Sequence, residues 1–295
     1  MNGTTLLDGG VATELQRGGL VVRPPWWTTK ALITEANRTR LRDVHRRYLE
    51  AGAEVVTAAT FRCNLRALRG MGLDAAGLAW MVHAAVGVAQ SARRAADCPD
   101  ALVAASVAPV EDAYRPDLVP SDDELREEHR WLATELSRAG VDLVLVETVN
   151  TVREARIALA AARDAGLRAW VGFVCGDDAR LLSGESLAEA ARAVEDGGAE
   201  AVLVNCTSLD RTERCLEVLR AACSGVIGAY PNLERRPAEH DEPPATAVTS
   251  DEFAQTLARW HDEHGARVLG GCCGSTPDHI AALRTALDLA GARAS

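Results

Sequence analysis

Eight short apolar runs, each followed by a segment with helical periodicity, alternate along the 295 residues of this chain. The runs are almost continuously apolar, as is typical of parallel strands that are buried on both faces. Right-handed strand–helix units that close after eight repeats form a TIM barrel, which takes about 250 residues. A doubly wound open sheet would use the same alternation, but it has fewer strands, and no Gly-x-Gly-x-x-Gly turn is present. We therefore predict the α/β class and a single (β/α)8 TIM barrel, with strands at residues 4–7, 54–59, 101–107, 142–146, 168–174, 201–204, 226–229 and 268–269.

No linker, charge run or low-complexity block divides the chain, so we expect residues 1–295 to form one domain. Hydrophobic residues make up 47% and charged residues 25%, which is ordinary for a soluble globular protein. The net charge of -10 argues against duplex DNA or an anionic membrane as a partner, because both attract a basic surface.

The N-terminal residues lack the charged and apolar regions of a signal peptide, and no apolar run is expected to reach membrane-spanning length. Eight cysteines in such a chain are expected to be reduced thiols rather than a disulfide framework. We therefore expect a cytoplasmic protein whose partners are small molecules, and we leave a homo-oligomer open.

Two adjacent cysteines, Cys272 and Cys273, lie between glycines where the eighth strand gives way to a helix. Glycines allow a tight hairpin there, so that both sulfurs could turn toward one point. Thiolates at one point are natural ligands for zinc, and Cys206, at the end of the sixth strand, is the best candidate for a third ligand. The alternatives are a strained disulfide between the two neighbours, or two inert buried thiols.

The barrel prediction favours the metal site over these alternatives. Catalytic groups of TIM barrels lie at the carboxyl ends of the strands, in the loops that lead to the helices. Asp8 follows the first strand, Glu147 ends the fourth, Cys206 ends the sixth, and Cys272 and Cys273 end the eighth. The unusual groups therefore fall on one face of one barrel.

Three thiolates leave an open fourth position on a tetrahedral zinc ion, where an incoming thiol would lose its proton and become a nucleophile. Glu147 is then placed to hold a cationic group, such as the amino group of an amino acid. The alternatives for Glu147 are a salt bridge inside the barrel or a charge at a helix N-terminus. The alternative for Asp8, which precedes two glycines, is a simple turn or cap.

Six motifs occur in order along nearly the whole chain: Leu7-Asp8-Gly9-Gly10 with Thr13-Glu14-Leu15, Ala51-Gly52-Ala53-Glu54-Val55, Val146-Glu147-Thr148, Asn205-Cys206, Tyr230-Pro231-Asn232 and Gly270-Gly271-Cys272-Cys273-Gly274. Together they resemble the homocysteine S-methyltransferase family. The resemblance implies a barrel in which Cys206, Cys272 and Cys273 bind zinc and the sulfur of homocysteine takes the fourth position. It also implies that Glu147 and the Asp8 loop hold the amino-acid end, and that the product is methionine. Thr148 and Asn205 adjoin these groups in sequence, and we include both among the substrate-binding candidates.

The chain departs from the family pattern around the expected donor side, at Ala108, Leu203, Leu233 and Glu234. The donor must carry a methyl group on a good leaving group. S-methylmethionine and S-adenosylmethionine satisfy this as sulfonium ions, and we expect no folate or cobalamin module. Trp26 and Trp27, in the long loop after the first strand, are candidates to stack on a sulfonium ion or to pack against the barrel rim.

We therefore predict zinc-dependent methyl transfer from S-methylmethionine or S-adenosylmethionine to L-homocysteine. One alternative is a betaine-dependent homocysteine methyltransferase. Another is a non-catalytic zinc- or thiol-binding barrel that senses homocysteine. The stretch at residues 233–249, rich in proline and charge, is a long loop and a candidate lid.

Overall fold

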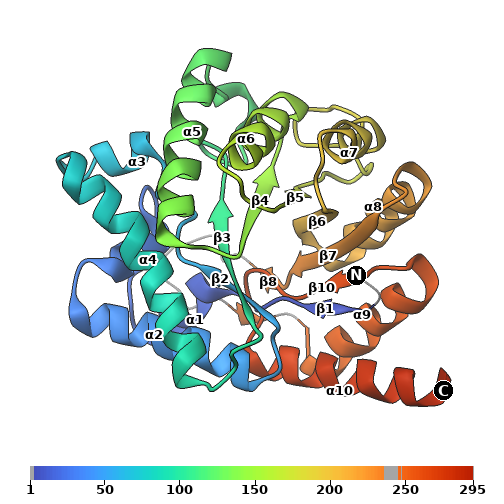
Figure 1. Ribbon diagram of the computed structural model, residues 1–295. Helices are drawn as coiled ribbons and strands as arrows, with labels where there is room; N and C mark the ends of the chain where they lie inside the picture. Colours follow the sequence, from blue (N-terminus) through green and yellow to red (C-terminus); the bar gives the residue numbers. More distant parts are fainter. Residues whose placement is uncertain (1–2, 236–244, 247, 295) are drawn as a thin grey trace.

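The computed structural model describes residues 3–235, 245–246 and 248–294, and its helices surround a central sheet (Figure 1). Eight strands form one sheet in the order β1-β10-β7-β6-β5-β4-β3-β2, and every neighbouring pair is parallel. The strands are β1 (Thr5–Leu6), β2 (Val55–Ala58), β3 (Leu102–Val107), β4 (Leu143–Val149), β5 (Ala169–Phe173), β6 (Ala201–Ser208), β7 (Val226–Asn232) and β10 (Val268–Leu269).

The first and last strands of that order also meet, and their contact closes the barrel. Leu7 and Val55 form a parallel bridge, and the Asp8 backbone N–H donates to the Val55 carbonyl over 2.9 Å. The predicted single (β/α)8 barrel is therefore confirmed. Closure also leaves no open sheet edge in the barrel.

A helix follows each strand, and several begin at side-chain caps that the sequence provides. The Thr34 hydroxyl accepts from the Asn37 backbone N–H and starts α2, and Ser121 with Glu124 forms a capping box at the start of α5. The helices are α1 (Val11–Arg17), α2 (Glu35–Glu50), α3 (Leu65–Arg69), α4 (Ala75–Ala95), α5 (Asp122–Ala139), α6 (Val152–Asp164), α7 (Leu187–Asp196), α8 (Leu209–Ala222), α9 (Ser250–His264) and α10 (Pro277–Ala294).

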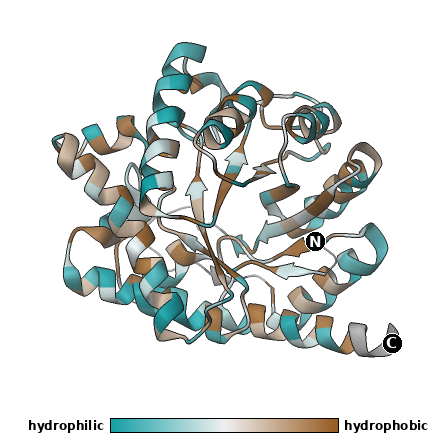
Figure 2. Ribbon diagram, viewed as in Figure 1, coloured by the Kyte–Doolittle hydropathy of each residue, from teal (hydrophilic) through white to brown (hydrophobic). Residues whose placement is uncertain are grey.

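The core has two parts, one inside the barrel and one between strands and helices. Several strands of the sheet carry mostly apolar residues, whereas the surrounding helices carry both hydrophilic and hydrophobic residues (Figure 2). Inside the barrel, Leu203 pairs in register with Gly172 on β5 and Gly228 on β7. Leu203 is fully buried at this position. This packing accommodates one of the departures from the family pattern.

Three strands run further than the sequence predicted, and one of them, β7, continues to Asn232. β4 continues to Val149 and β6 continues to Ser208, and each register shifts at a β-bulge, after Val146 and after Asn205. A bulge changes the direction in which the neighbouring side chains point. The apolar pattern stops at each bulge, and for that reason the sequence placed both strand ends too early.

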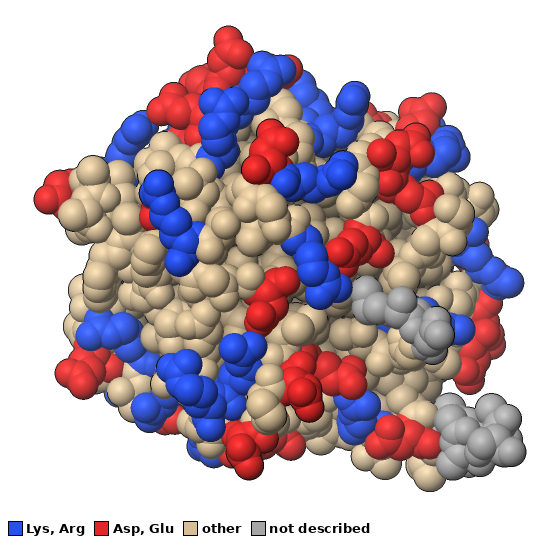
Figure 3. Space-filling model, viewed as in Figure 1, with Lys and Arg blue, Asp and Glu red and all other residues tan. Residues whose placement is uncertain are grey.

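Charges of both signs are interspersed over the face shown in Figure 3. Among the described residues, α4 is the one helix long and apolar enough to cross a membrane, which corrects the expectation that no segment reaches that length. It packs against α2 and α5 with a stripe of buried residues. Of the candidate lid, residues 236–244 and 247 lie outside the described residues, and β8 (Glu234–Arg235) pairs antiparallel with β9 (Ala245–Thr246).

Candidate metal and substrate site

Three cysteine sulfurs converge at the carboxyl ends of β6 and β10. The Sγ atoms of Cys206, Cys272 and Cys273 all lie within 4.8 Å of one another. All eight cysteines lie within the described residues, and none forms a disulfide. The disulfide alternative therefore does not describe this structure, and the convergence predicted from the barrel is present.

The hairpin that carries Cys272 and Cys273 is held through Ser275. The Ser275 hydroxyl donates to the Cys272 carbonyl over 2.7 Å and accepts from the Gly10 backbone N–H over 3.0 Å. A Cβ atom on Gly271 would lie 2.2 Å from the Ser275 Oγ, so the close approach requires glycine at that position. The β1 loop and the cysteine hairpin therefore form one hydrogen-bonded unit.

Helix α1 also contacts the cysteine hairpin, through Thr13 and Arg17. The Gly274 backbone N–H donates to the Thr13 Oγ1 over 3.2 Å, and the Arg17 guanidinium donates to the Gly274 carbonyl over 3.0 Å. Glu14 is buried and pairs with both Arg17 and Arg47. The Thr13-Glu14 part of the first motif therefore holds the hairpin in place.

Cys206 occupies the bulge of β6 with a left-handed backbone angle, φ 48°. Such an angle is uncommon for a residue other than glycine and costs on the order of 1–3 kcal/mol. Hydrogen bonds from the Cys272 and Cys273 thiols hold the pKa of Cys206 well below its usual value, and the Tyr114 hydroxyl adds another. The cluster therefore favours a thiolate on Cys206.

Thr148 and Asn205 lock the bulges of β4 and β6 together. The Thr148 backbone N–H donates to Asn205 Oδ1 over 2.9 Å, and Asn205 Nδ2 donates to Thr148 Oγ1 over 2.8 Å. Thr148 also has a left-handed backbone angle, φ 57°. These two residues bind each other, so the structure gives them a positioning role, and their predicted contact with substrate stays a prediction.

Glu147 lies in the bulge of β4, buried among three donors. The hydroxyls of Ser106 and Tyr230 donate to its carboxylate, Tyr230 over 3.1 Å, and Asn205 Nδ2 lies 3.5 Å from its Oε2. Burial raises the pKa of Glu147 to about 7 against these hydrogen bonds, and the charges of Asp8 and Cys273 raise it further. Among the described residues, no arginine, lysine or histidine forms an ion pair with this carboxyl group, so the salt-bridge alternative does not describe this structure.

Asp8 is also buried and is held by one neighbour. The backbone N–H and hydroxyl of Thr57 donate to its two carboxylate oxygens over 2.7 Å and 2.8 Å. Burial raises the pKa of Asp8 to about 7. Two buried carboxyl groups with raised pKa values beside a thiol cluster form a site that an incoming cation would stabilise.

Trp26 directly precedes the short helix Trp27–Leu32, and Trp27 is the first residue of that helix. The indole N–H of Trp26 donates to the Ala67 carbonyl of α3 over 3.1 Å, and the Lys30 ammonium lies 5.4 Å from the Trp26 ring centre. The Trp26 ring therefore already lies close to a cation of this chain, the Lys30 ammonium group. Contact of Trp26 with a methyl donor stays a prediction.

Sequence reasoning missed several groups that complete the site. Ser106, Thr57 and Tyr114 contact Glu147, Asp8 and Cys206 respectively. The signal for Ser106 and Thr57 was their position near the carboxyl ends of apolar strands. For Tyr114, in the loop between β3 and α5, the sequence carried no signal.

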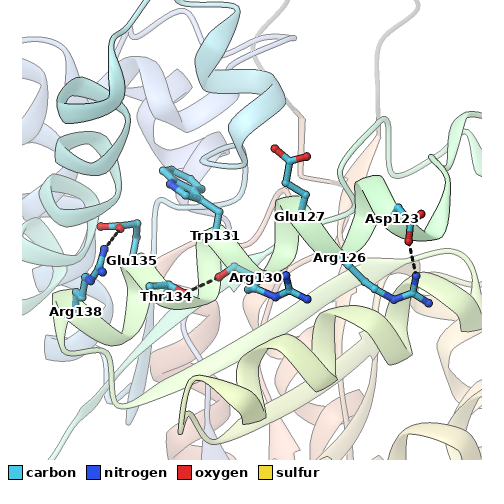
Figure 4. A pocket seen from close by; sticks show the side chains of 8 residues that line it. All are labelled: Asp123, Arg126, Glu127, Arg130, Trp131, Thr134, Glu135 and Arg138. Carbon is cyan, nitrogen blue, oxygen red and sulfur yellow. Dashed lines mark hydrogen bonds and ion pairs between the residues drawn. The ribbon is translucent and has the colours of Figure 1, made fainter.

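Two features elsewhere on the surface do not compete with this site. Glu213, Glu263 and His264 also bring ligand atoms together, but the Arg259 guanidinium binds both carboxylates and supplies the cation. A hollow of about 410 Å³ lies along the outer face of α5, between side chains such as Arg130 and Trp131 (Figure 4). It is on the helix ring, away from the thiol cluster.

Fold and site together define a TIM barrel with a thiol cluster at the carboxyl ends of its strands, the face on which the active sites of such barrels lie. The chain belongs to the homocysteine S-methyltransferase family, whose sequence model matches residues 5–287. It is therefore a methyltransferase that acts on homocysteine.

The chain matches its relatives over most of their length. The chain is 32% identical to the homocysteine S-methyltransferase of Escherichia coli over 301 residues, which cover 95% of this chain and 94% of that protein. It is 30% identical to the selenocysteine Se-methyltransferase of Brassica oleracea, over 97% of this chain and 89% of that protein. The crystal structure of the Escherichia coli homocysteine methyltransferase MmuM, in its metallated form, superposes with a TM-score of 0.83 at 30% identity and covers 96% of both chains.

Proposed function

We propose that this protein transfers a methyl group from a small sulfonium donor, S-methylmethionine or S-adenosylmethionine, to the thiolate of L-homocysteine and thereby forms methionine. The observation that carries the proposal is the convergence of three thiols beside two buried carboxyl groups with raised pKa values. Thiolates are suitable ligands for a soft metal ion, and carboxylates can bind a positively charged amino group.

The donor set fits zinc. Cys206, Cys272 and Cys273 would hold the ion, and three thiolates leave a fourth position open, as catalytic zinc sites do. When bound, zinc supplies a positive charge that lowers the pKa of a thiol placed at that open position. The Escherichia coli relative has been solved in a metallated form, which supports metal binding by this chain.

Asp8 and Glu147 would hold the amino end of homocysteine. Both carboxyl groups lose their contact with water on burial, which disfavours their charged forms. An ammonium group bound between them would stabilise the charged forms through charge-assisted hydrogen bonds. Ser106, Thr57 and Tyr230 fix the orientation of the two carboxyl groups through hydrogen bonds. The amino acid is then bound at both ends, by its sulfur and by its nitrogen, which orients the sulfur for attack.

The transfer itself needs no further cofactor. The homocysteine thiolate gives an electron pair to the methyl carbon, and the bond from that carbon to the sulfonium sulfur breaks. The donor leaves as a neutral thioether. Leaving-group chemistry therefore favours a sulfonium donor over betaine, whose leaving group is an amine.

The whole chain would act as one homocysteine-binding domain, because the eight strands and their helices extend from the first described residues to residue 294. All eight cysteines carry free thiols, which suits a reducing compartment, so we place the protein in the cytoplasm. Its partners would be homocysteine and the methyl donor.

Methionine formation should be measured with S-methylmethionine, S-adenosylmethionine and betaine at equal concentrations. Turnover with a sulfonium donor is expected to exceed turnover with betaine. Transfer from betaine alone would show that the donor assignment is wrong. Binding of homocysteine without transfer from any donor would favour the sensor alternative.

Zinc should be tested separately, by elemental analysis of the purified chain and of Cys206→Ser, Cys272→Ser and Cys273→Ser. One zinc per chain is expected in the unaltered protein and a large loss in each variant. Cys98→Ser is the matched control, since Cys98 lies outside the cluster and should retain the metal. Full retention in all three cluster variants would refute the assignment.

A further inference from the structure

Tyr48 lies where helix α2 meets the β1 loop and the cysteine hairpin, and it belongs to none of the family motifs. The residue is fully buried, and its hydroxyl donates to the Ser275 carbonyl over 3.1 Å. The Arg17 guanidinium also approaches this carbonyl, over 3.5 Å, from a partly exposed position. Tyr48 is therefore the closer and the more deeply buried donor to the end of the hairpin.

The side chain of Tyr48 also sets how closely the backbone of Gly9 can pass. A Cβ atom on Gly9 would lie 2.8 Å from the Tyr48 Cε1 and hydroxyl oxygen, and 2.5 Å from the Ser275 Oγ. Real Cβ atoms do not approach other atoms so closely, so the Gly9 backbone is packed against both side chains. Because Gly9 directly follows Asp8, this contact fixes the backbone that carries the Asp8 carboxyl group.

Two hydrogen bonds join the same stretch of backbone to the cysteine hairpin. The Gly271 N–H donates to the Asp8 carbonyl over 3.0 Å, and the Gly10 N–H donates to the Ser275 hydroxyl oxygen over 3.0 Å. Tyr48 contacts both the β1 loop and the hairpin, so it braces this connection from α2. The separation between the Asp8 carboxyl group and the hairpin sulfurs is therefore fixed by buried contacts.

A fixed separation determines which amino acid reaches both ends of the site. In the proposed function, the sulfur of the substrate meets the thiol cluster and its amino group meets Asp8 and Glu147. Cysteine has one methylene group fewer than homocysteine between its α-carbon and its sulfur, so it falls short of a separation that suits homocysteine. A difference of one methylene group discriminates between substrates by about 10- to 200-fold.

We infer that Tyr48 is a positioning residue that sets the length of the substrate. It holds the Asp8 backbone at a fixed separation from the cysteine hairpin, so that homocysteine binds in preference to cysteine. The inference rests on the proposed function, in which Asp8 and the thiol cluster bind opposite ends of one amino acid. It gives helix α2 a part in substrate selection, although α2 lies outside the barrel.

The test removes the hydroxyl of Tyr48 and keeps the ring. Purified unaltered protein and Tyr48→Phe would be loaded with Zn²⁺, and binding of L-homocysteine and of L-cysteine would be measured by titration calorimetry. The unaltered protein is expected to prefer homocysteine by about tenfold or more. In Tyr48→Phe this preference should fall about fivefold, because the β1 loop and the hairpin can then shift relative to each other. The ratio of the two affinities is decisive, since a general loss of stability weakens both affinities alike.

Ile227→Val is the matched control. Ile227 is also buried, but it lies at the amino end of β7, the opposite end of the barrel from the site. Its variant should keep the preference of the unaltered protein. An unchanged preference in Tyr48→Phe would overturn the inference, and so would an equal change in Ile227→Val or the absence of a preference in the unaltered protein.

Methyl transfer, measured on the same samples, separates this inference from the proposed function. A preference for homocysteine that depends on Tyr48, without transfer from any donor, would refute the proposed transfer and support the role of Tyr48. Transfer to homocysteine together with an unchanged preference in Tyr48→Phe would refute the role of Tyr48 alone.

Discussion

Asn205 and Thr148 each donate one hydrogen bond to the other, over 2.8 Å and 2.9 Å, and this pair joins the bulges of β6 and β4. The residue beside each member is a functional candidate, Cys206 next to Asn205 and Glu147 next to Thr148. The spacing between the thiol cluster and the carboxyl group is therefore set by a side-chain pair inside the barrel rather than by either strand alone.

Asn205→Ala removes both bonds and leaves the buried Thr148 N–H without its partner. Unfolding free energy should fall by about 3 kcal/mol, whereas Thr148→Val, which keeps the backbone donor, should cost about 1 kcal/mol. Urea unfolding of both variants and of the double variant measures the coupling between them. Strictly additive losses would show that the two side chains act independently.

Gly172→Ala tests the space that the Asn205 side chain occupies. A Cβ atom at residue 172 would lie 2.9 Å from Asn205 Oδ1 and 3.0 Å from the Tyr230 hydroxyl oxygen. The variant should lose about 1–3 kcal/mol of stability and bind homocysteine more weakly, because both neighbours position Glu147. Gly87→Ala, in open space on α4, is the control and should gain about 0.5–1 kcal/mol. Equal effects in both variants would exclude a local clash.

Glu147→Gln should raise the KM for homocysteine about 10-fold or more and change kcat little, because the lost contact is to the unreacting amino end. Steady-state kinetics at saturating donor separates the two constants. Glu128→Gln removes a buried carboxylate that contacts Arg66 outside the barrel, and its KM should stay unchanged. A large fall in kcat at constant KM would instead give Glu147 a role in the chemical step.

The raised pKa of Glu147 predicts a pH dependence of stability in the metal-free protein. A folded-state pKa of about 7, against an ordinary value of 4.5, means that the folded state binds more protons between those pH values. The contribution of this group to stability is present at low pH and is lost as the pH rises through 7.

Urea unfolding of the unaltered protein and of Glu147→Gln, at pH 5 and pH 8, measures this contribution. Between these pH values the unaltered protein should lose about 3 kcal/mol relative to the variant, from about two pH units at about 1.4 kcal/mol each. A difference that does not change with pH would show that Glu147 is ionised throughout.

The sequence by itself determined the barrel and the face on which the site lies. Eight almost continuously apolar runs, separated by amphipathic helices, leave few ways to bury both faces of every strand. Because parallel strands all end on one side, the polar residues Asp8, Glu147 and Cys206 had to gather there. Their chemistry was therefore visible before any contact was known.

Only the tertiary structure decided how these groups are held. The bulges at Glu147 and Cys206, the bond from Gly10 to Ser275 and the reach of Tyr114 to Cys206 depend on contacts between residues far apart in sequence. Local periodicity carries no information about such contacts, because each is made by the closure of the barrel. The raised pKa values of Asp8 and Glu147 have the same origin, since burial by the closed barrel is what removes water from both carboxyl groups.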